Sequence, residues 1–396
     1  MERLIPARKR SDWGSLSALP RLLGTEPDGQ PWAELWFGTH PAGQSRLADG
    51  RTLGEMVAAA PERCLGGDVV RRFGERLPFL LKLIAPARSL SLQVHPSLER
   101  AAEGFAAEEA AGVALDSPVR SFKDANHKPE MVLALEQFEA VAGFRAPRRA
   151  AEVLAGLESA VARRMRRTLR LNPTRYGIRT AFTELLAPQT RPAPEDLAAL
   201  VEEIRLRLER GETPSRRAYS NVVSMARDFP ADPGVAASLL LNPVTLRPWE
   251  ALFIPAGSVH AYVSGLGVEV MASSDNVLRA GLTTKHVDVP TMLTCVDYVA
   301  APPVRPAPEY LSRTTRAYYA PVEDFELLLT QVRPEDGLVP VPGRGARLLL
   351  VVEGALRVST SRGALPLSQG QGAFVGDDEN GLRAEGAGRL VQTDVP

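Results

Sequence analysis

The sequence has little cysteine, with only Cys64 and Cys295 among 396 residues. Two cysteines cannot build the disulfide framework of a small secreted protein, and so few fit a reducing compartment. Long apolar runs are also missing, since no stretch reaches the roughly 18 residues that a membrane-spanning helix needs. The basic start of the chain lacks the apolar run of a signal peptide. We therefore expect a cytoplasmic protein that contacts no membrane.

Net charge is absent as well, because 47 Lys and Arg residues balance 47 Asp and Glu residues. A protein without net charge has no overall electrostatic attraction to nucleic acid. Any anionic ligand must therefore be held by a local cluster of cations. The basic run RRMRR at residues 163–167 is more typical of a solvated helix face with one apolar stripe. We expect no nucleic-acid partner.

Histidine is scarce and unevenly placed. The chain contains five, none of them between residues 128 and 259 or after residue 286: His40, His95, His127, His260 and His286. Imidazole chemistry is therefore confined to the first part of the chain and to a central stretch at residues 253–289. We interpret His40 and His286 as structural.

The length and a hydrophobic content of 44% indicate a globular protein of two or three domains. Residues 1–147 contain short apolar runs separated by Gly, Pro and Ser, which is typical of an antiparallel β domain, interrupted by a helical excursion at residues 99–124. Residues 148–240 have apolar positions at helical spacing, as at 150–169 and 195–208, and predict an all-helical insertion. Residues 241–300 complete the first domain.

The last part of the chain, residues 301–396, returns to β character after a linker rich in Pro and Ala. Its apolar runs predict separate strands at residues 325–329, 347–352, 355–358 and 372–375. The glycines between these runs indicate a small sandwich or jelly roll. Because this part contains neither His nor Cys, we expect no second metal centre there.

The central stretch opens with an apolar run that ends at Pro-Ala-Gly, residues 255–257. Proline cannot donate to a sheet and glycine tolerates positive φ, so the chain turns there and His260 begins the next strand. A side chain held by rigid backbone suits a metal ligand or a catalytic base, although a single such histidine is more often structural. Further along, Gly-Leu-Gly at residues 265–267 predicts a hairpin turn, since no helix follows to form a dinucleotide site.

A first partner for His260 lies in SLSLQVHP, residues 89–96. Strict alternation places Gln93 and His95 on one strand face, with Ser91 beside them. A solvent-facing strand is the ordinary explanation of such a face. An adjacent Gln and His also resemble a pair of metal ligands on a barrel strand.

A second partner lies in NHKPEM, residues 126–131. Pro129 forces Lys128 into an extended conformation and marks the entrance of a strand. Glu130 is then the first residue of an apolar strand, the same placement that His260 has. Three polar residues at the ends of apolar strands predict a common site more strongly than any one of them.

Gln93, His95, Glu130 and His260 together form a candidate metal site with two nitrogen and two oxygen ligands. Two neutral imidazoles, an amide and one carboxylate leave a divalent ion with a net positive charge, so the ion keeps its Lewis acidity. A mononuclear iron in a two-His-one-carboxylate triad is the competing assignment. We favour zinc, because Gln93 occupies a position that an oxygenase would leave open.

Cations accompany the predicted ligands in the same stretches of sequence. They are Lys82, Lys128, Arg279 and Lys285. Each alone is more typical of a surface, but four near one site in a chain without net charge indicate an anionic substrate. Phosphate is the simplest candidate, since Arg offers a bidentate fork and Lys a point charge.

These motifs resemble the type I mannose-6-phosphate isomerases, also called phosphomannose isomerases. The resemblance rests on SLQVHP, on NHKPEM and on AGSVHAY with the following GVEVMASSDNVLRAGLTTKHVDV, together with WGS at 13–15 and AELWFGTHP at 33–41. It spans nearly the whole chain. Ser97 and Thr284 depart from the pattern of many relatives, but neither is a ligand position.

The resemblance implies two cupin-like jelly rolls, the first interrupted by a helical domain. It also implies one zinc ion held by the four predicted ligands, a catalytic Arg279, and interconversion of mannose 6-phosphate and fructose 6-phosphate through an enediolate. Such an enzyme belongs to carbohydrate metabolism, including GDP-mannose biosynthesis, and we expect a monomer. A non-catalytic sugar-phosphate sensor and a metal-dependent oxygenase are the rival classes.

Several roles stay open at the level of sequence. The candidates for carrying the proton between C1 and C2 are a zinc-bound water and four side chains: His127, Lys128, Glu269 and Asp275. His127 also suits ring opening, since its ordinary pKa is about 6.5. We expect Lys285, with Lys82 or Ser91, to hold the phosphate. For Glu269, which lies on an apolar strand, a buried ion pair is the alternative to substrate contact.

Overall fold

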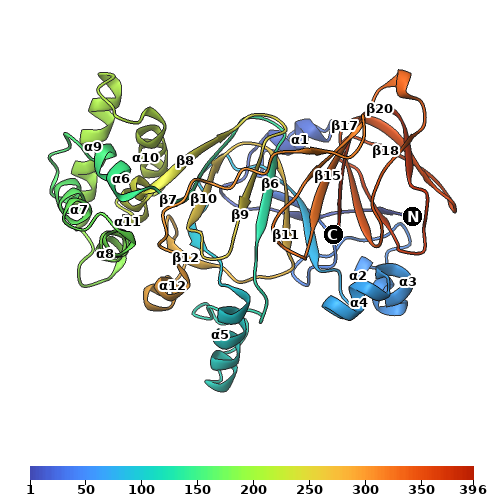
Figure 1. Cartoon of the computed structure of the whole chain (residues 1–396), viewed down its shortest axis with the longest axis horizontal. Coiled ribbons are helices and arrows are strands. Elements are labelled where there is room, and N and C mark those ends of the chain that lie inside the picture. The colour runs from blue at the N-terminus through green and yellow to red at the C-terminus, as the bar shows by residue number, and fades with distance from the viewer.

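The computed structural model covers residues 1–396 and is mainly β, with three sheets built from antiparallel strand pairs. The helices of residues 147–240 gather at one end of the molecule and a nine-stranded sheet occupies the other (Figure 1). Two smaller sheets lie between these ends. No helix is both long and apolar enough to cross a membrane. The predicted mainly β class is confirmed.

The two smaller sheets pack face to face. The five-stranded sheet consists, in order, of β12 (Leu278–Gly281), β5 (Leu92–Val94), β10 (His260–Ser264), β7 (Phe138–Phe144) and β8 (Leu241–Leu246). The six-stranded sheet consists of β2 (Ala7–Lys9), β3 (Glu34–Phe37), β4 (Phe79–Ile84), β11 (Gly267–Ala272), β6 (Glu130–Ala134) and β9 (Ala251–Ile254). Side chains of both sheets, including Ile84, Val132 and Tyr262, share one core cluster.

The predicted hairpin at residues 265–267 is wrong. Strand β10 pairs with β5 and β7, whereas β11 pairs with β4 and β6. The turn therefore carries the chain from one sheet to the other. Gly265 has a φ of +140°, and a Cβ there would lie 2.6 Å from the Phe138 ring, so this crossing requires glycine. The turn residues alone do not reveal which strands pair, because the partners are distant in sequence.

Between β7 and β8 the chain forms helices only. They are α6 (Pro147–Val153), α7 (Ala160–Leu171), α8 (Arg175–Leu186), α9 (Pro194–Glu209), α10 (Arg216–Asp228), α11 (Pro233–Ala237) and the 3-10 turn η1 (Ser238–Leu240). The predicted run at 150–169 is divided, because the chain turns at Gly156 with a φ of +77°. One large core cluster joins these helices to Leu92, Val94 and Val141 of the five-stranded sheet.

Residues 1–147 contain more helix than predicted. Besides the expected helix α5 (Leu98–Ala110), they form α1 (Ala18–Leu22), α2 (Leu53–Ala59), α3 (Pro61–Leu65) and α4 (Gly67–Phe73). These helices are too short to show a helical period in the sequence. Local capping supports them: in α2 the hydroxyl of Thr52 accepts from the N–H of Glu55, whose carboxylate accepts from the N–H of Thr52.

The nine-stranded sheet contains the C-terminal part of the chain and its first strand. Its members are β1 (Glu2–Leu4), β13 (Glu309–Tyr310), β14 (Thr315–Tyr318), β15 (Glu326–Val332), β16 (Val339–Pro340), β17 (Arg347–Thr360), β18 (Gly363–Ser368), β19 (Gly372–Val375) and β20 (Arg383–Asp394), with the turn η2 (Pro334–Asp336) and, before it, helix α12 (Val289–Cys295). The strands predicted at 347–352 and 355–358 are one strand, β17. Strand β17 pairs with β20 on both sides of a bulge between Val351 and Glu353. Gly354, next to the bulge, has a φ of +74°.

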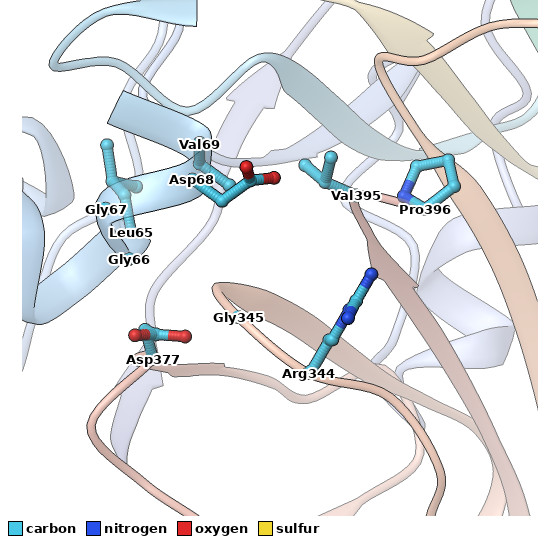
Figure 2. A pocket seen from close by; sticks show the side chains of 10 residues that line it. All are labelled: Leu65, Gly66, Gly67, Asp68, Val69, Arg344, Gly345, Asp377, Val395 and Pro396. Atoms are coloured by element: carbon cyan, nitrogen blue, oxygen red, sulfur yellow. The ribbon is translucent and has the colours of Figure 1, made fainter. Parts of the chain in front are cut away.

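A cavity of about 410 Å³ lies where α3 and α4 meet the C-terminal sheet. The side chains of Asp68, Arg344 and Asp377 point into it, and Pro396 closes one side (Figure 2). All three charged side chains are exposed. This cavity shares no lining residue with the predicted metal site.

Candidate metal centre and active site

The four predicted ligands come from three neighbouring points of the two facing sheets. His260 begins β10 and pairs in register with Gln93 of β5. His95 follows one residue after β5 ends, and Glu130 begins β6 opposite Ile254. The predicted strand starts at His260 and Glu130 are therefore confirmed.

The side chains of these residues converge. The ligand atoms of His95, Glu130 and His260 lie within 4.8 Å of one another. Nε2 of His95 is 3.2 Å from Oε1 of Glu130, and Nε2 of His260 is 3.4 Å from Oε2 of Glu130. All three residues are buried. Gln93 lies beside them, with its Nε2 3.2 Å from Nε2 of His260.

Hydrogen bonds to the backbone orient both imidazoles. Nδ1 of His95 is 2.6 Å from the carbonyl of Asn276, and Nδ1 of His260 is 3.0 Å from the carbonyl of Ser258. A carbonyl only accepts, so Nδ1 carries the proton in each ring and the lone pair of Nε2 faces the cluster. Metal-binding histidines are typically held by such a bond from the second ring nitrogen.

The cluster fits a divalent metal ion. Nε2 of His95 and Oε2 of Glu130 are buried without a hydrogen-bond partner. Burial lowers the pKa of His95 to about 4, so the ring is neutral at neutral pH. Burial alone would raise the pKa of Glu130, but His95 and Lys128 hold that pKa well below its usual range. Two neutral imidazoles and a carboxylate are donors that zinc accepts.

Gln93 needs one local change to join as an oxygen ligand. Its Oε1 accepts from the hydroxyl of Ser91 at 3.3 Å, and its amide nitrogen faces His260. A half-turn of the amide exchanges oxygen and nitrogen without moving the backbone. The Ser91 hydroxyl can then accept from the amide nitrogen, since a hydroxyl both donates and accepts.

Asn276 ties together the two loops that flank the cluster. Its amide nitrogen donates to the carbonyls of Asp124 and Asn126 at 2.7 and 2.8 Å, and its Oδ1 accepts from the N–H of Lys123 at 2.7 Å. Its own carbonyl binds His95. Asn276 thereby couples the loop before Glu130 to the loop before β12, and sequence reasoning did not single it out.

Lys82 lies in a buried ion-pair network. Its Nζ is 3.0 Å from Oε2 of Glu269 and 3.3 Å from Oε1 of Glu34. Burial alone would lower the pKa of Lys82, but the carboxylates of Glu269, Glu34 and Glu130 raise it. The sequence places Lys82 and Glu269 among substrate contacts, whereas the structure places both in this network.

Tyr262 and Glu34 also belong to the site, and sequence reasoning missed both. The hydroxyl of Tyr262 is buried without a hydrogen-bond partner, and burial, Glu269 and Glu130 raise its pKa. The signal for Tyr262 was available, because it lies two residues after His260 and so on the same face of β10. Glu34 gave no signal of its own, since its contact with Lys82 depends on the pairing of β3 with β4.

Two cations, Lys128 and Arg279, lie near the cluster with fewer partners, and Lys285 lies near Arg279. Nζ of Lys128, which is buried, lies 3.4 Å from Oε1 of Glu130. Arg279 pairs in register with Gln93 across β12 and β5, and burial lowers the pKa of its guanidinium. The positive charge of Arg279, followed by burial, lowers the pKa of Lys285. Arg279 and Lys285 are therefore close enough for the charge of Arg279 to act on Lys285.

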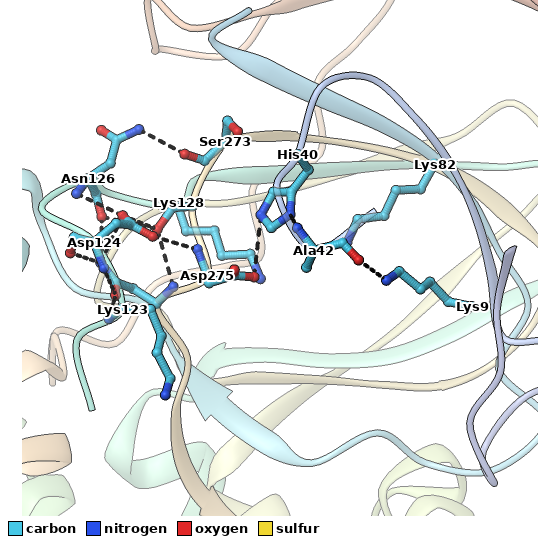
Figure 3. Close-up of polar contacts among 12 residues, drawn as sticks. Lys9, His40, Ala42, Lys82, Lys123, Asp124, Asn126, Lys128, Ser273 and Asp275 are labelled. Carbon is cyan, nitrogen blue, oxygen red and sulfur yellow. Dashed lines mark hydrogen bonds and ion pairs between the residues drawn. The ribbon is translucent and has the colours of Figure 1, made fainter. Parts of the chain in front are cut away.

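Two other predicted residues are engaged by distant partners. Nε2 of His127 is 2.9 Å from Oδ2 of Asp324, which lies 197 positions later in the chain. Oδ1 of Asp275 is 3.3 Å from Nε2 of His40, whose Nδ1 accepts from the N–H of Ala42 (Figure 3). His40, interpreted as structural, thus contacts a predicted site residue.

A cavity of about 500 Å³ opens beside this His40–Asp275 pair. Lys123 and Asp124 also line it, and Lys128 follows Asp124 four residues later in the chain. The charges of Lys82 and Lys128 act on the pKa of His40, after burial and Asp275. The cavity therefore adjoins the candidate site.

Known proteins are similar to this chain. Residues 1–147 match the model of the phosphomannose isomerase type I catalytic domain. The mannose-6-phosphate isomerase of Salmonella typhimurium is 36% identical, with 99% of each chain covered. The chain belongs to the type I mannose-6-phosphate isomerase family. The predicted family, and with it the class of isomerases, is confirmed.

Other members of the isomerase family are similar over comparable lengths. The mannose-6-phosphate isomerase of Bos taurus is 33% identical, covering 93% of this chain and 90% of its own. A crystal structure of mannose 6-phosphate isomerase bound with zinc and yttrium has a TM-score of 0.89 at 33% identity, covering 100% of this chain and 99% of that one. The likeness thus extends over the whole fold.

Proposed function

We propose that this chain interconverts mannose 6-phosphate and fructose 6-phosphate through an enediolate. The observation that carries the proposal is the convergence of His95, Glu130 and His260, whose Nε2 and carboxylate atoms lie within 4.8 Å in a buried site bordered by cations. We infer the substrate from membership of the isomerase family. The site supplies the chemistry that such a substrate needs.

Gln93, His95, Glu130 and His260 would hold one zinc ion per chain. When bound, zinc supplies a Lewis acid for the oxygens on C1 and C2 of the open-chain sugar. Arg279, paired opposite Gln93, adds positive charge where the enediolate develops. Because Arg279 is partly buried, water screens its charge less than it would screen the charge of a surface arginine.

In this proposal, Lys128 or Glu269 transfers the proton between C1 and C2 of the sugar. Lys128 borders Glu130 at 3.4 Å, and burial raises the pKa of Glu269 toward working pH, although Lys82 opposes that shift. Asp275 and His127 are each engaged by another side chain, which favours a positioning role for Asp275 and a ring-opening role for His127. Hydrogen exchange at C2 in Lys128→Met and Glu269→Gln separates the two carriers.

The phosphate of the sugar is assigned to Lys285 and Arg279, with Ser91 as a hydroxyl donor. Burial lowers the pKa of Arg279, whereas the charge of Arg279, followed by burial, lowers the pKa of Lys285, and no carboxylate contributes to either shift. A dianionic phosphate would satisfy this pair. The buried network of Lys82 favours a role in positioning Glu269 over phosphate contact.

We also propose the domain division that the sequence predicts. Residues 1–147 and 241–300 would form one cupin-like jelly roll that holds the metal, residues 148–240 a helical insertion, and residues 301–396 a second jelly roll without metal. The helices of residues 147–240 all lie between β7 and β8, and the outer C-terminal strands have a core cluster of their own, which supports this division. A cytoplasmic monomer fits the composition.

The decisive experiment measures fructose 6-phosphate formed from mannose 6-phosphate, with metal analysis of the same protein. We expect turnover that a chelator abolishes and zinc restores. Metal binding and sugar-phosphate binding without turnover would indicate a sensor. An iron-containing protein that consumes oxygen would indicate an oxygenase.

A further inference from the structure

The imidazole ring of His40 is held on three sides. The residue is only 3% exposed, and its Nδ1 accepts a hydrogen bond from the N–H of Ala42 at 3.2 Å. Its ring meets the Trp36 ring edge-on, with centroids 5.0 Å apart, and the Trp36 ring in turn lies 5.1 Å from Nζ of Lys82. On the third side, Nε2 of His40 lies 3.3 Å from Oδ1 of Asp275 (Figure 3). These contacts give the ring a single orientation.

The contact with Ala42 determines which nitrogen of His40 carries the proton. A backbone N–H only donates, so Nδ1 is the acceptor and Nε2 carries the proton of the neutral ring. A charged ring would place a second proton on Nδ1, directly against the N–H of Ala42. Burial lowers the pKa of His40, which agrees with a neutral ring. His40 therefore directs an N–H group at Asp275 and leaves the negative charge of that carboxylate in place.

The side chain of Asp275 depends on His40 for its direction. The backbone N–H of Asp275 donates to Oδ2 of Asp124 at 2.8 Å, and Oδ1 of Asp124 accepts from the hydroxyl of Ser274 at 2.8 Å. These bonds fasten the loop but do not reach the carboxylate of Asp275. That carboxylate is 49% exposed, and His40 is the only basic residue in contact with it.

The carboxylate of Asp275 lies between the proposed active site and an open cavity. Its loop joins β11, which contains Glu269, to β12, which contains Arg279. Asp275 and His40 both line the cavity of about 500 Å³. An ionised carboxylate accepts hydrogen bonds and donates none, so the hydroxyl groups of a sugar are suitable partners for it.

We infer that His40 is a positioning residue of the isomerase, whose Nε2–H holds the carboxylate of Asp275 toward the cavity, where the carboxylate accepts a hydroxyl group of the sugar phosphate. The inference rests on the proposed function, because that function supplies the sugar. It replaces the structural role that the sequence indicates for His40. His40 neither binds the metal nor transfers a proton in this role, and it acts only through Asp275.

Nitrogen NMR of protein labelled with nitrogen-15 histidine tests the tautomer directly. The chain has five histidines, and His40→Gln identifies the ring signals of His40 by their loss. At neutral pH we expect a neutral His40 ring with its proton on Nε2, with or without added zinc. A charged ring, or a proton on Nδ1, would overturn the inference. This measurement needs no turnover and is therefore independent of the proposed isomerase activity.

Two matched variants test the role in the reaction. In His40→Gln the amide nitrogen replaces Nε2 as the donor to Asp275, so most of the activity should remain. In His40→Asn the shorter amide reaches only the position of Nδ1, and kcat/KM should fall by about 10²-fold, the cost expected when a group is misplaced by about 1 Å. Zinc content and unfolding temperature should be similar in the two variants. Equal losses of activity in both would indicate a structural role and overturn the inference.

The variant Asp275→Ala tests whether His40 acts through Asp275, since it removes the carboxylate and keeps the backbone bond to Asp124. Adding His40→Asn to Asp275→Ala should lower kcat/KM no further than Asp275→Ala alone, whereas His40→Asn and the exposed change Glu385→Gln should combine additively. Additive losses for His40 and Asp275 in an active enzyme would overturn this inference alone. A native chain without turnover would instead refute the proposed function.

Discussion

Gln93 and His260 lie directly opposite each other on the antiparallel strands β5 and β10, 167 positions apart in the chain. The register of this pair determines whether a metal site exists. A slip of one residue would turn His260 to the other face of its sheet and separate it from Glu130. The backbone bonds that hold Nδ1 of His95 and His260 then fix the direction of the lone pairs.

Replacing His260 by Ala should remove the zinc. The remaining donors cannot close a tetrahedral site, so zinc content should fall by more than the roughly 10–100-fold cost of losing a supporting residue. Metal analysis of purified protein, with circular dichroism to verify folding, measures this. His286→Ala is the matched control, since His286 is exposed and should leave the zinc content unchanged. Full zinc occupancy in His260→Ala would refute the ligand set.

Replacing Arg279 by Ala should lower kcat by about 10²–10³, the typical cost of losing one donor that stabilises a developing oxyanion. Zinc content should change little, because no ligand is removed. Arg279→Lys should recover part of the activity, since the charge returns without the planar fork. Equal losses of kcat and of zinc would mean that Arg279 acts on the metal site and not on the enediolate.

Replacing Lys82 by Met should destabilise the protein by about 3–5 kcal/mol, because the buried Glu269 and the half-buried Glu34 would be left without their cation. The double variant Lys82→Met/Glu269→Gln should recover much of this loss. Urea unfolding of the single and double variants gives the coupling. Arg205→Met breaks an exposed pair with Glu202, and should cost no more than about 1 kcal/mol. Additive effects of the Lys82 and Glu269 changes would exclude a coupled pair.

Glu326 and Asp394 lie opposite each other on β15 and β20, and should make stability depend on pH. Burial raises the pKa of both carboxyls, and for Asp394 the neighbouring Glu326 raises it further. The folded chain therefore holds more protons than the unfolded chain above pH ~4, so the free energy of unfolding falls as pH rises through this window.

Glu326→Gln should be more stable than the native chain at pH 7.5, by about 1.4 kcal/mol for each unit of pKa shift removed. Its stability should also vary less between pH 5 and 8. Glu385→Gln, an exposed change on the same sheet, should follow the native profile. Urea unfolding at several pH values measures this, and parallel profiles for all three proteins would contradict the prediction.

The sequence by itself determined where polar side chains interrupt apolar strands. Proline before Glu130 and the Pro-Ala-Gly turn before His260 act on their immediate neighbours, so the strand starts and the four candidate ligands could be named in advance. The long helices of residues 147–240 were likewise visible, since their period repeats over several turns. The short helices α1 to α4 were not, because five to seven residues show no period.

Only the tertiary structure decided which charges meet. Lys82 pairs with Glu269 and Glu34, and His127 pairs with Asp324. These outcomes depend on strand pairings between distant segments, such as β4 with β11. They also depend on which charged side chains the fold buries away from water. Local sequence carries no record of such distances, because ion pairing is set by separation in space and not along the chain.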